Sequence, residues 1–445
     1  MNLSQRLGSP VMGQTPSGKN GHGVADELFQ ALYLEVVDSL DTTGIKQLDP
    51  RELRKRVSEL VSEALRVQRA SISPQQRDRV VNAITDEILG LGPLEVLLAD
   101  PTVSDIMVNT HQCVFVERNG VIEETDVSFR SERHLLNTIN RIVTQVGRRV
   151  DEASPMVDAR LPDGSRVNAI IPPLAVDGAI LSIRRFGTGP VSLKELVTRR
   201  TCPAEMAHYF KAAVRSRCNI LICGGTGAGK TTLLNALSRY IPSRERIVTI
   251  EDSAELQLQS RHVARLETRP PNIEGKGCVT IRDLLRNALR MRPDRIIIGE
   301  VRSAEALDMI QAMNTGHEGS MTTIHANNVE DAVTRLMSML AMAGTQLSEA
   351  MMLQMITRAI DVVVHVARGR DGRRQVTEVA ELAGVSCHQV PPPAPPDYRG
   401  QVELNALFAL DGRSGGWSCS GYSLLQNRFE DAGCPLDPRW LRGAR

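Results

Sequence analysis

The sequence predicts an α/β protein in which a mainly parallel sheet with helices on both faces is preceded by an α+β domain and a small helical module. Two observations lead to this prediction. In residues 191–385, short runs of consecutive apolar residues alternate with helical patterns, which is typical of parallel strands joined by helices. In residues 26–190, apolar residues recur first at helical spacing and then in short β-like runs that turn residues interrupt.

The first elements are helical. Residues 1–25 are rich in Gly, Ser, Pro and Asn and predict a disordered tail. Apolar residues at helical spacing then predict a helical module over residues 26–80. A helix that begins near the end of this module, at residue 75, is expected to end at Gly90 and Gly92.

Residues 81–190 predict the α+β domain. The pair Asn119-Gly120 signals a hairpin between two β-like runs, and the turn Pro162-Asp163-Gly164 signals a second change of direction. A helical pattern covers residues 131–147. The expected β segments of this domain are residues 104–109, 113–120, 121–129, 158–173 and 179–187.

Residues 191–385 predict the α/β core, which follows a linker around residues 187–200. The expected strands are residues 219–225, 246–252, 295–301 and 320–325. Because functional loops of such sheets lie at the carboxyl ends of the strands, we expect the chemistry there. Residues 386–445 contain a Pro-rich run and both tryptophans, and their pattern indicates no role.

The composition is that of a globular protein of two to four domains. The 445 residues are 24% charged and carry a formal net charge of +1, so the overall charge does not favour DNA or an anionic membrane. The sequence shows no secretory leader pattern and no run of about 18 apolar residues, so we expect a cytoplasmic protein. The 8 cysteines form no Cys-x-x-Cys pair, which favours free thiols over a zinc site.

A phosphate-binding motif, Gly-x-x-x-x-Gly-Lys-Thr, lies between a predicted buried strand and a predicted helix. Its glycines let backbone N–H groups approach phosphates, Lys230 can neutralise β/γ oxygens, and Thr231 can bind Mg²⁺. The flanking strand and helix argue against a simple glycine turn with a surface lysine. The predicted nucleotide-binding residues are Gly224, Gly225, Thr226, Gly227, Ala228, Gly229, Lys230, Thr231 and Thr232.

Polar side chains follow three other predicted strands. Glu251, Asp252 and Glu255 lie at the end of one strand, Glu300 follows the next, and His325 closes the last. Hydrolysis of a bound nucleotide requires acids that hold Mg²⁺ and orient or deprotonate water. A single acid after a strand is usually a turn residue, but two such strand ends beside a phosphate loop favour a hydrolytic site. His325 could report whether the γ-phosphate is present.

The loop, residues 249–256 and residues 282–328 together resemble the secretion ATPases of the type II/type IV superfamily. Their marks are a Walker A loop, an Asp box, a Gly-Glu Walker B motif and a His box. Residues 90–109 and 147–173 narrow the resemblance to the CpaF-type ATPases, also called TadA, of tight-adherence (Flp) pilus assembly. The resemblance covers roughly residues 80–385.

The resemblance implies a RecA-like P-loop NTPase core that binds ATP and Mg²⁺. It also implies a homohexamer, peripheral at the cytoplasmic face of the inner membrane, that couples ATP hydrolysis to extrusion of pilin subunits through a membrane platform protein. By position, Lys230 and Thr231 would hold phosphates and Mg²⁺, Glu255 would activate water, and Glu300 would act on the metal or its water. His325 would be the His-box residue, and the division of roles between the two glutamates stays open.

Arginines complete the implied site. Arg302 would be a polar partner, and family members present arginines from the N-terminal domain to the nucleotide, for which Arg160, Arg166 and Arg184 are the candidates. Solvated strand arginines are the alternative for each of these three.

A further arginine row, Arg282, Arg286 and Arg290, recurs every four residues on one helix face. Thr280 and Asp283 fit a capping box at the start of that helix. Such a row is usually solvated, and in a ring it could also meet a neighbouring subunit.

Three alternatives to a pilus motor remain. A RecA-like motor on nucleic acid should show a basic stripe with aromatic residues, whereas the aromatic content is 3%, so we expect no nucleic acid partner. A non-hydrolysing, nucleotide-gated scaffold would not need both Glu255 and Glu300. A VirB11-like type IV secretion ATPase shares the core motifs but moves other cargo. The identity of the filament, and extension against retraction, stay open.

Overall fold

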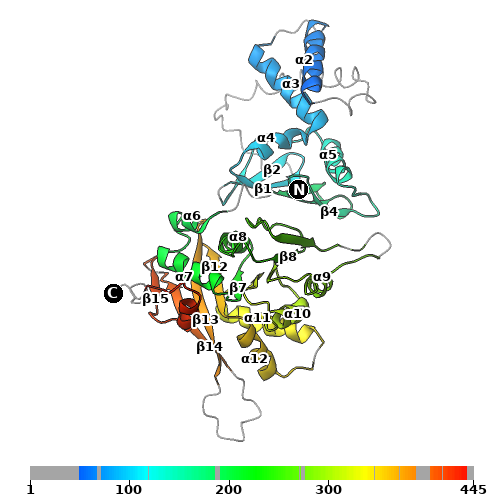
Figure 1. Cartoon of the computed structure of the whole chain (residues 1–445). Helices are drawn as coiled ribbons and strands as arrows, with labels where there is room; N and C mark the ends of the chain where they lie inside the picture. The colour runs from blue at the N-terminus through cyan, green and yellow to red at the C-terminus, as the bar shows by residue number, and fades with distance from the viewer. Residues whose placement is uncertain are drawn as a thin grey trace, which may run out of the picture. The chain divides into compact units, whose positions relative to one another are not determined.

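The computed structural model describes residues 50–67, 72–118, 120–185, 191–269, 271, 276–344, 346–369, 371–386, 401–412 and 414–437. The predicted tail, the first half of the predicted helical module and the Pro-rich run lie outside these residues. The chain divides into two compact units (Figure 1). The first contains most residues up to Arg184, and the second contains Arg185–Arg445 with the short segments Arg118–Val121 and Asp163–Ser165.

A pair of helices begins the described part of the first unit. These are α2 (Pro50–Val67) and α3 (Pro74–Leu89), and the second has a capping box in which Ser73 and Gln76 each bond to the other's backbone N–H. Apolar residues recur at helical spacing in both helices because they face one small shared core. This core is formed by Leu53, Val57, Val61, Ala64, Leu65, Val81 and Ile84. The predicted helical structure is present at Pro50–Val67 and Pro74–Leu89, and the part of the predicted module before residue 50 lies outside the described residues.

The rest of the first unit is a sheet covered by helices. Its strands lie in the order β3-β2-β1-β6-β5-β4, with β1 antiparallel to β6, β6 to β5 and β5 to β4. A core joins this sheet to the apolar stripe of α5. The elements are η2 (Gly92–Leu94), α4 (Glu95–Ala99), β1 (Val103–Thr110), β2 (Cys113–Arg118), β3 (Val121–Glu124), α5 (Glu132–Gln145), β4 (Met156–Arg160), β5 (Arg166–Ile170) and β6 (Ile180–Arg184).

Two predicted β segments of this unit are too long. Residues 158–173 form two strands, β4 and β5, on either side of the predicted turn. The β-like run from residue 121 to 129 is a strand only to Glu124, because the chain then turns back across the hairpin. The N–H of Thr125 donates to the Val114 carbonyl, and the N–H of Phe129 donates to the His111 carbonyl. The last apolar residue of the run, Phe129, is buried in the core from a loop.

The second unit is built on a sheet in which the described residues form nine strands, ordered β15-β14-β13-β12-β7-β11-β10-β8-β9. Neighbours from β12 to β9 are parallel, and β13, β14 and β15 add an antiparallel extension. The strands are β7 (Ile220–Gly224), β8 (Ile247–Glu251), β9 (Val263–Glu267), β10 (Arg295–Ile298), β11 (Met321–Ile324), β12 (Val362–Arg368), β13 (Arg374–Ser386), β14 (Gln401–Leu410) and β15 (Trp417–Cys419).

Helices cover both faces of this sheet, which confirms the predicted α/β architecture (Figure 1). Along β7, Ile220 and Ile222 belong to one core, and Leu221 and Cys223 belong to the other. This explains the uninterrupted apolar runs, since both sides of each central strand are buried. The first core includes α6 (Leu193–Thr198), α7 (Ala204–Arg215), α8 (Lys230–Ser238) and α13 (Gln426–Asp431), and the second includes α9 (Ile281–Ala288), α10 (Glu305–Met313), α11 (Val329–Met342) and α12 (Glu349–Ala359).

The chain after residue 386, to which the sequence assigned no role, continues the same sheet. Glu381 of β13 is fully buried and accepts hydrogen bonds from the Tyr209 hydroxyl at 2.8 Å, the Ser423 hydroxyl at 2.6 Å and the Leu424 N–H at 2.6 Å. Such a buried carboxylate is stable only when donors satisfy it. The C-terminal elements therefore share a polar hub and a core with α7.

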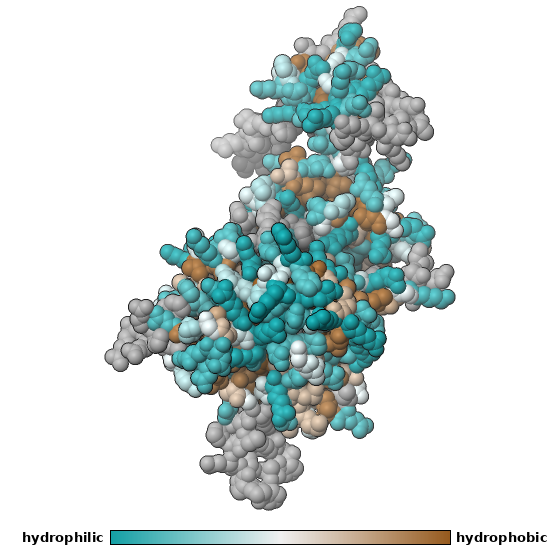
Figure 2. All heavy atoms as spheres, in the orientation of Figure 1, coloured by the Kyte–Doolittle hydropathy of each residue, from teal (hydrophilic) through white to brown (hydrophobic). Residues whose placement is uncertain are grey.

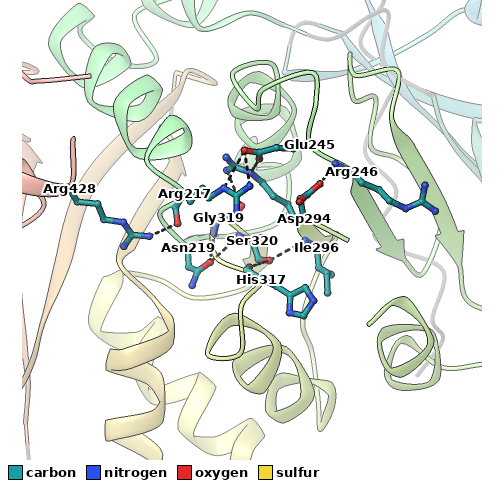
Figure 3. Close-up of polar contacts among 11 residues, drawn as sticks. Arg217, Asn219, Glu245, Arg246, Asp294, Ile296, His317, Gly319, Ser320 and Arg428 are labelled. Carbon is teal, nitrogen blue, oxygen red and sulfur yellow. Dashed lines mark hydrogen bonds and ion pairs between the residues drawn. The ribbon is translucent and has the colours of Figure 1, made fainter. Parts of the chain in front are cut away.

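A second buried polar network lies at the amino ends of the central strands (Figure 3). The Asn219 side-chain oxygen accepts from the N–H groups of Gly319 and Ser320, and its NH₂ donates to the Ala359 carbonyl. Arg295, at the start of β10, is fully buried, and its Nε lies 2.5 Å from Glu245 Oε2, just before β8. These contacts fix the parallel strands relative to one another at the edge opposite the phosphate loop.

The apolar content of the helices, the surface and the cysteines can also be compared with the sequence. None of the described helices is both long and apolar enough to cross a membrane. Hydrophilic side chains cover most of the second unit on the face shown in Figure 2. In the part of the chain that the structure describes, these cysteines are free: Cys113, Cys202, Cys218, Cys223, Cys278, Cys419 and Cys434.

Candidate functional site

The phosphate motif forms the connection from β7 to α8. At Gly224 the backbone has a φ of +154°, and a Cβ there would collide with the Val366 carbonyl oxygen of β12. Gly229, with a φ of +101°, is the N-cap of α8. Only glycine adopts both conformations without strain. The loop therefore ends at the start of α8, where no side chain caps the first N–H groups, as suits an anion site.

The Lys230 side chain folds back onto this loop and binds its carbonyl groups. The residue is 8% exposed, and its Nζ donates to the carbonyls of Gly224 at 2.9 Å and Gly225 at 2.8 Å. Burial lowers the pKa of this lysine, and the neighbouring Glu300 opposes that shift. A Cβ at Gly225 would meet no atom within 4 Å, so there is open space beside the loop. Lys230 and this space fit a bound phosphate chain.

Parallel pairing brings the other predicted residues to the same edge. Because β7 pairs with β11, β11 with β10, and β10 with β8, the carboxyl ends of these strands are neighbours. His325 Nε2 lies 3.0 Å from Glu300 Oε1 and 3.5 Å from Lys230 Nζ. Burial, followed by the charge of Lys230, lowers the pKa of His325, which favours a neutral imidazole.

Arg302 joins two strand ends. Its guanidinium lies 2.8 Å from Glu300 Oε2 and 3.5 Å from Asp252 Oδ2. The hydrogen bond to Glu300 raises the pKa of Arg302. The structure therefore places Lys230, His325, Glu300, Arg302 and Asp252 in one continuous chain of contacts.

The two remaining acids of the Asp box differ in exposure. Glu251 is 3% exposed and points into the protein, where its Oε2 accepts from the N–H groups of Glu255 and Leu256. Burial raises its pKa to about 7. Glu255 lies on the turn after β8 and is half-buried. Its charge acts on Arg302, which contacts Asp252.

The predicted Mg²⁺ ligands are oxygen atoms at one edge of the sheet. Within the described ranges there is no group of three or more His, Cys, Asp or Glu side chains placed to hold a metal. Mg²⁺ is usually held by one or two carboxylates together with nucleotide phosphates, so such a group is not required. Glu300 Oε1 is buried and receives no hydrogen bond of normal geometry among the described residues. This orphaned oxygen and the Thr231 hydroxyl, in the first turn of α8, fit that pattern.

Arg374 is a residue of the site that sequence reasoning missed. At the start of β13, its Nε donates to the Gly227 carbonyl of the phosphate loop at 2.9 Å. No local pattern could reveal it, because the residue lies far along the chain and reaches the loop only through the pairing of β13 with β12 and of β12 with β7.

The three candidate arginines of the first unit are aligned. Arg160 lies opposite Arg166 on the neighbouring strand, and Arg166 lies opposite Arg184. Asp105 of β1 continues the row, and its Oδ1 lies 2.9 Å from Arg184 Nε. Directly paired residues share one face of a sheet, so these residues form a single charged row across four strands.

Two members of the arginine row, Arg282 and Arg286, have a partner within the same chain. Arg282 Nε lies 2.6 Å from one oxygen of Asp308, and Arg286 Nε lies 3.1 Å from the other. The predicted capping box of Thr280 and Asp283 is present. Arg282 and Arg286 thus form ion pairs with Asp308 of α10 and are not simply solvated.

Comparison with known proteins identifies the family. Residues 87–410 match the model of the family described as Type II/IV secretion system protein. A putative conjugal transfer protein of Mycobacterium tuberculosis is 38% identical over 308 residues, which cover 68% of this chain and 87% of that protein. Protein VirB11 of Agrobacterium fabrum is 31% identical over 306 residues, which cover 62% of this chain and 87% of that protein.

A solved structure is also similar. The crystal structure of the VirB11 ATPase from the Brucella suis type IV secretion system, in complex with sulphate, has 30% sequence identity and a TM-score of 0.35, and the match covers 65% of this chain and 95% of that one. The superfamily predicted from the sequence is confirmed by the family model, and the narrower resemblance to tight-adherence pilus ATPases stays a prediction. The chain belongs to the type II/IV secretion system protein family.

Proposed function

We propose that this protein is a cytoplasmic, homohexameric ATPase with a RecA-like core that powers assembly of a tight-adherence (Flp, type IV-like) pilus. It would act through a platform protein at the inner membrane. The observation that carries the proposal is the chain of contacts from Lys230 through His325, Glu300 and Arg302 to Asp252 beside the phosphate loop. The pilus branch is supported by residues 90–109 and 147–173, which resemble that branch.

The side chains at the strand ends have separate tasks in this proposal. Lys230 leaves the loop carbonyls and binds β/γ-phosphate oxygens, and Glu255 accepts a proton from the attacking water. Bound Mg²⁺ would neutralise charge that develops on the phosphates, with Thr231 and Glu300 as the residues that hold it. Arg302 binds one oxygen of the Glu300 carboxylate, and His325 Nε2 lies 3.0 Å from the other.

The arginine row of the first unit completes the proposed site. Arg160, Arg166 or Arg184 would bring a cation to the nucleotide, which makes hydrolysis depend on domain movement.

Steady-state phosphate release by the full-length chain tests the proposal. Wild type should hydrolyse ATP in the presence of the platform protein, and Lys230→Ala and Glu255→Gln should each lower kcat by roughly 100-fold or more. Glu349→Gln, an exposed acid in the first turn of α12, is the matched control and should leave the rate unchanged. Bound ATP without turnover in the wild type would instead support a nucleotide-gated scaffold.

A VirB11-like type IV secretion ATPase is the second candidate. It is favoured by the names of the relatives, which include a putative conjugal transfer protein and protein VirB11. Co-purification of the full-length protein with its neighbouring gene products separates the two functions. A pilus motor should retain a platform membrane protein encoded beside a small pilin, whereas a conjugation-type motor should retain components of a type IV secretion channel.

A further inference from the structure

Glu251 is a buried acid at the site that the proposed mechanism does not use. It ends β8, two residues beyond Thr249 on the same side of the strand, and is 3% exposed. Its Oε2 accepts two backbone hydrogen bonds, from Glu255 at 2.7 Å and from Leu256 at 2.9 Å. Its Oε1 is buried and has no hydrogen-bond partner among the described residues. Only one oxygen of the Glu251 carboxyl, Oε2, therefore accepts hydrogen bonds among the described residues, and both come from the turn that carries Glu255.

Other contacts also hold this turn, whose Leu256 is buried in a hydrophobic core of the second unit. Arg265 donates to the Ala254 carbonyl at 3.2 Å, and the N–H of Gln257 donates to the Asn235 side chain of α8 at 2.9 Å. Neither contact involves the backbone of Glu255. Because the N–H of Glu255 donates to Glu251, that hydrogen bond helps to set the direction in which the Glu255 side chain leaves the turn.

Gly299 provides the room for Glu251. A Cβ at Gly299 would lie 3.0 Å from Cγ of Glu251, closer than carbon atoms normally approach. Gly299 directly follows β10 and precedes Glu300. Strands β8 and β10 pair from Ile247 with Arg295 to Ile250 with Ile298. Gly299, just after β10, therefore lies beside Glu251 and leaves space for its side chain.

We propose that Glu251 is a positioning residue for Glu255. It acts through its reach, that is, the side-chain length that places Oε2 at the N–H of Glu255, and not through negative charge. The inference rests on the proposed hydrolytic function, in which Glu255 receives the proton. A general base must lie within hydrogen-bond distance of the water it activates, and an error of about 1 Å in such a placement can cost 100-fold in rate. The side chain that fixes the backbone of Glu255 therefore controls the rate without contact with the nucleotide.

The local charges agree with a neutral carboxyl. Burial raises the pKa of Glu251 to about 7, against the opposing effect of the two N–H donors and of Arg265, and the charge of Glu255 adds to the rise. A protonated carboxyl still offers Oε2 as an acceptor, so loss of the charge does not remove the bond to Glu255.

Two variants of Glu251 separate reach from charge. Glu251→Gln keeps the length and an acceptor oxygen but cannot ionise, so kcat for ATP should stay within about threefold of wild type. Glu251→Asp keeps the charge but withdraws the oxygen by one methylene, so kcat should fall roughly 30-fold while KM for ATP stays within about twofold. Thr249→Val is the matched control, since it changes a buried side chain on the same face of β8 and should leave kcat unchanged.

The measurements are steady-state phosphate release and binding of a fluorescent ATP analogue by the full-length protein, with Glu255→Gln in parallel. Loss of activity in Glu251→Gln would overturn the inference, because charge would then be needed. Full activity in Glu251→Asp would also overturn it, because reach would not matter. If Glu255→Gln retains wild-type kcat, the proposed role of Glu255 fails, and this outcome is independent of the Glu251 variants.

Discussion

Glu300 and His325, which follow adjacent parallel strands, lie 3.0 Å apart from Oε1 to Nε2. The contact joins the acid proposed for the Walker B position to the residue proposed for the His box, and Lys230 lies 3.5 Å from the same imidazole nitrogen. Since a neutral histidine can accept a hydrogen bond from Lys230 or donate one to Glu300, the imidazole can favour different arrangements of the two charged groups. This relationship makes His325 the first residue to test.

We expect His325→Ala to lower kcat by roughly 10- to 100-fold with little change in KM for ATP. The physical reason is that Glu300 loses the imidazole that lies 3.0 Å from its Oε1, while the phosphate loop keeps its shape. Phosphate release at saturating ATP measures the effect. His208→Ala, an exposed histidine on α7, is the control, and equal losses in both variants would contradict a role for His325.

The pKa of Glu251 predicts how stability changes with pH. Its usual value is 4.5, and the folded value is about 7, so between these pH values the folded protein binds more protons than the unfolded one. The free energy of unfolding should therefore fall as pH rises through this window. Glu251→Gln lacks this loss and should be more stable than wild type by about 1–3 kcal/mol at pH 8, with the difference shrinking toward pH 5.

Thermal unfolding of wild type and Glu251→Gln at several pH values measures this difference. A gain that is the same at pH 5 and pH 8 would show that the pKa of Glu251 is not raised.

The buried pair of Arg295 and Glu245 should be costly to break. Arg295→Met leaves Glu245, which is 4% exposed, with a charge whose remaining partner is Arg217, and we expect a loss of about 3–5 kcal/mol in stability. The double variant Arg295→Met/Glu245→Met should recover part of this loss, because no charge is then left buried. Arg244→Met, at an exposed position beside Glu245, is the control for both in thermal unfolding.

Phe429 should anchor the C-terminal segment. Its ring is fully buried and lies 5.6 Å from that of Tyr209 in an edge-to-face arrangement. Phe429→Ala should lower the stability of the second unit by about 3–5 kcal/mol through the cavity it leaves. Tyr422→Ala, which removes a ring that is 62% exposed, should have a small effect. Equal unfolding temperatures for Phe429→Ala and wild type would show that the segment is not part of the folded core.

The sequence by itself determined the elements whose causes are local. Apolar runs predicted the central strands β7, β8, β10 and β11, because a strand buried on both faces needs no polar position. Glycine and lysine spacing predicted the phosphate loop, since its backbone conformation depends on its own residues. The position of Glu300 and His325 after strands also followed from local pattern, because parallel strands end at one edge of a sheet.

Only the tertiary structure decided which residues meet across long stretches of chain. Strand register aligned Arg160, Arg166 and Arg184 in one row, and sheet order brought Arg374 to the phosphate loop. Helix packing paired two α9 arginines with Asp308. The strands after residue 386 escaped detection because their pattern is weak and their stability comes from the buried hub at Glu381. Each of these contacts depends on the relative placement of distant backbone segments, which side-chain spacing within one segment does not encode.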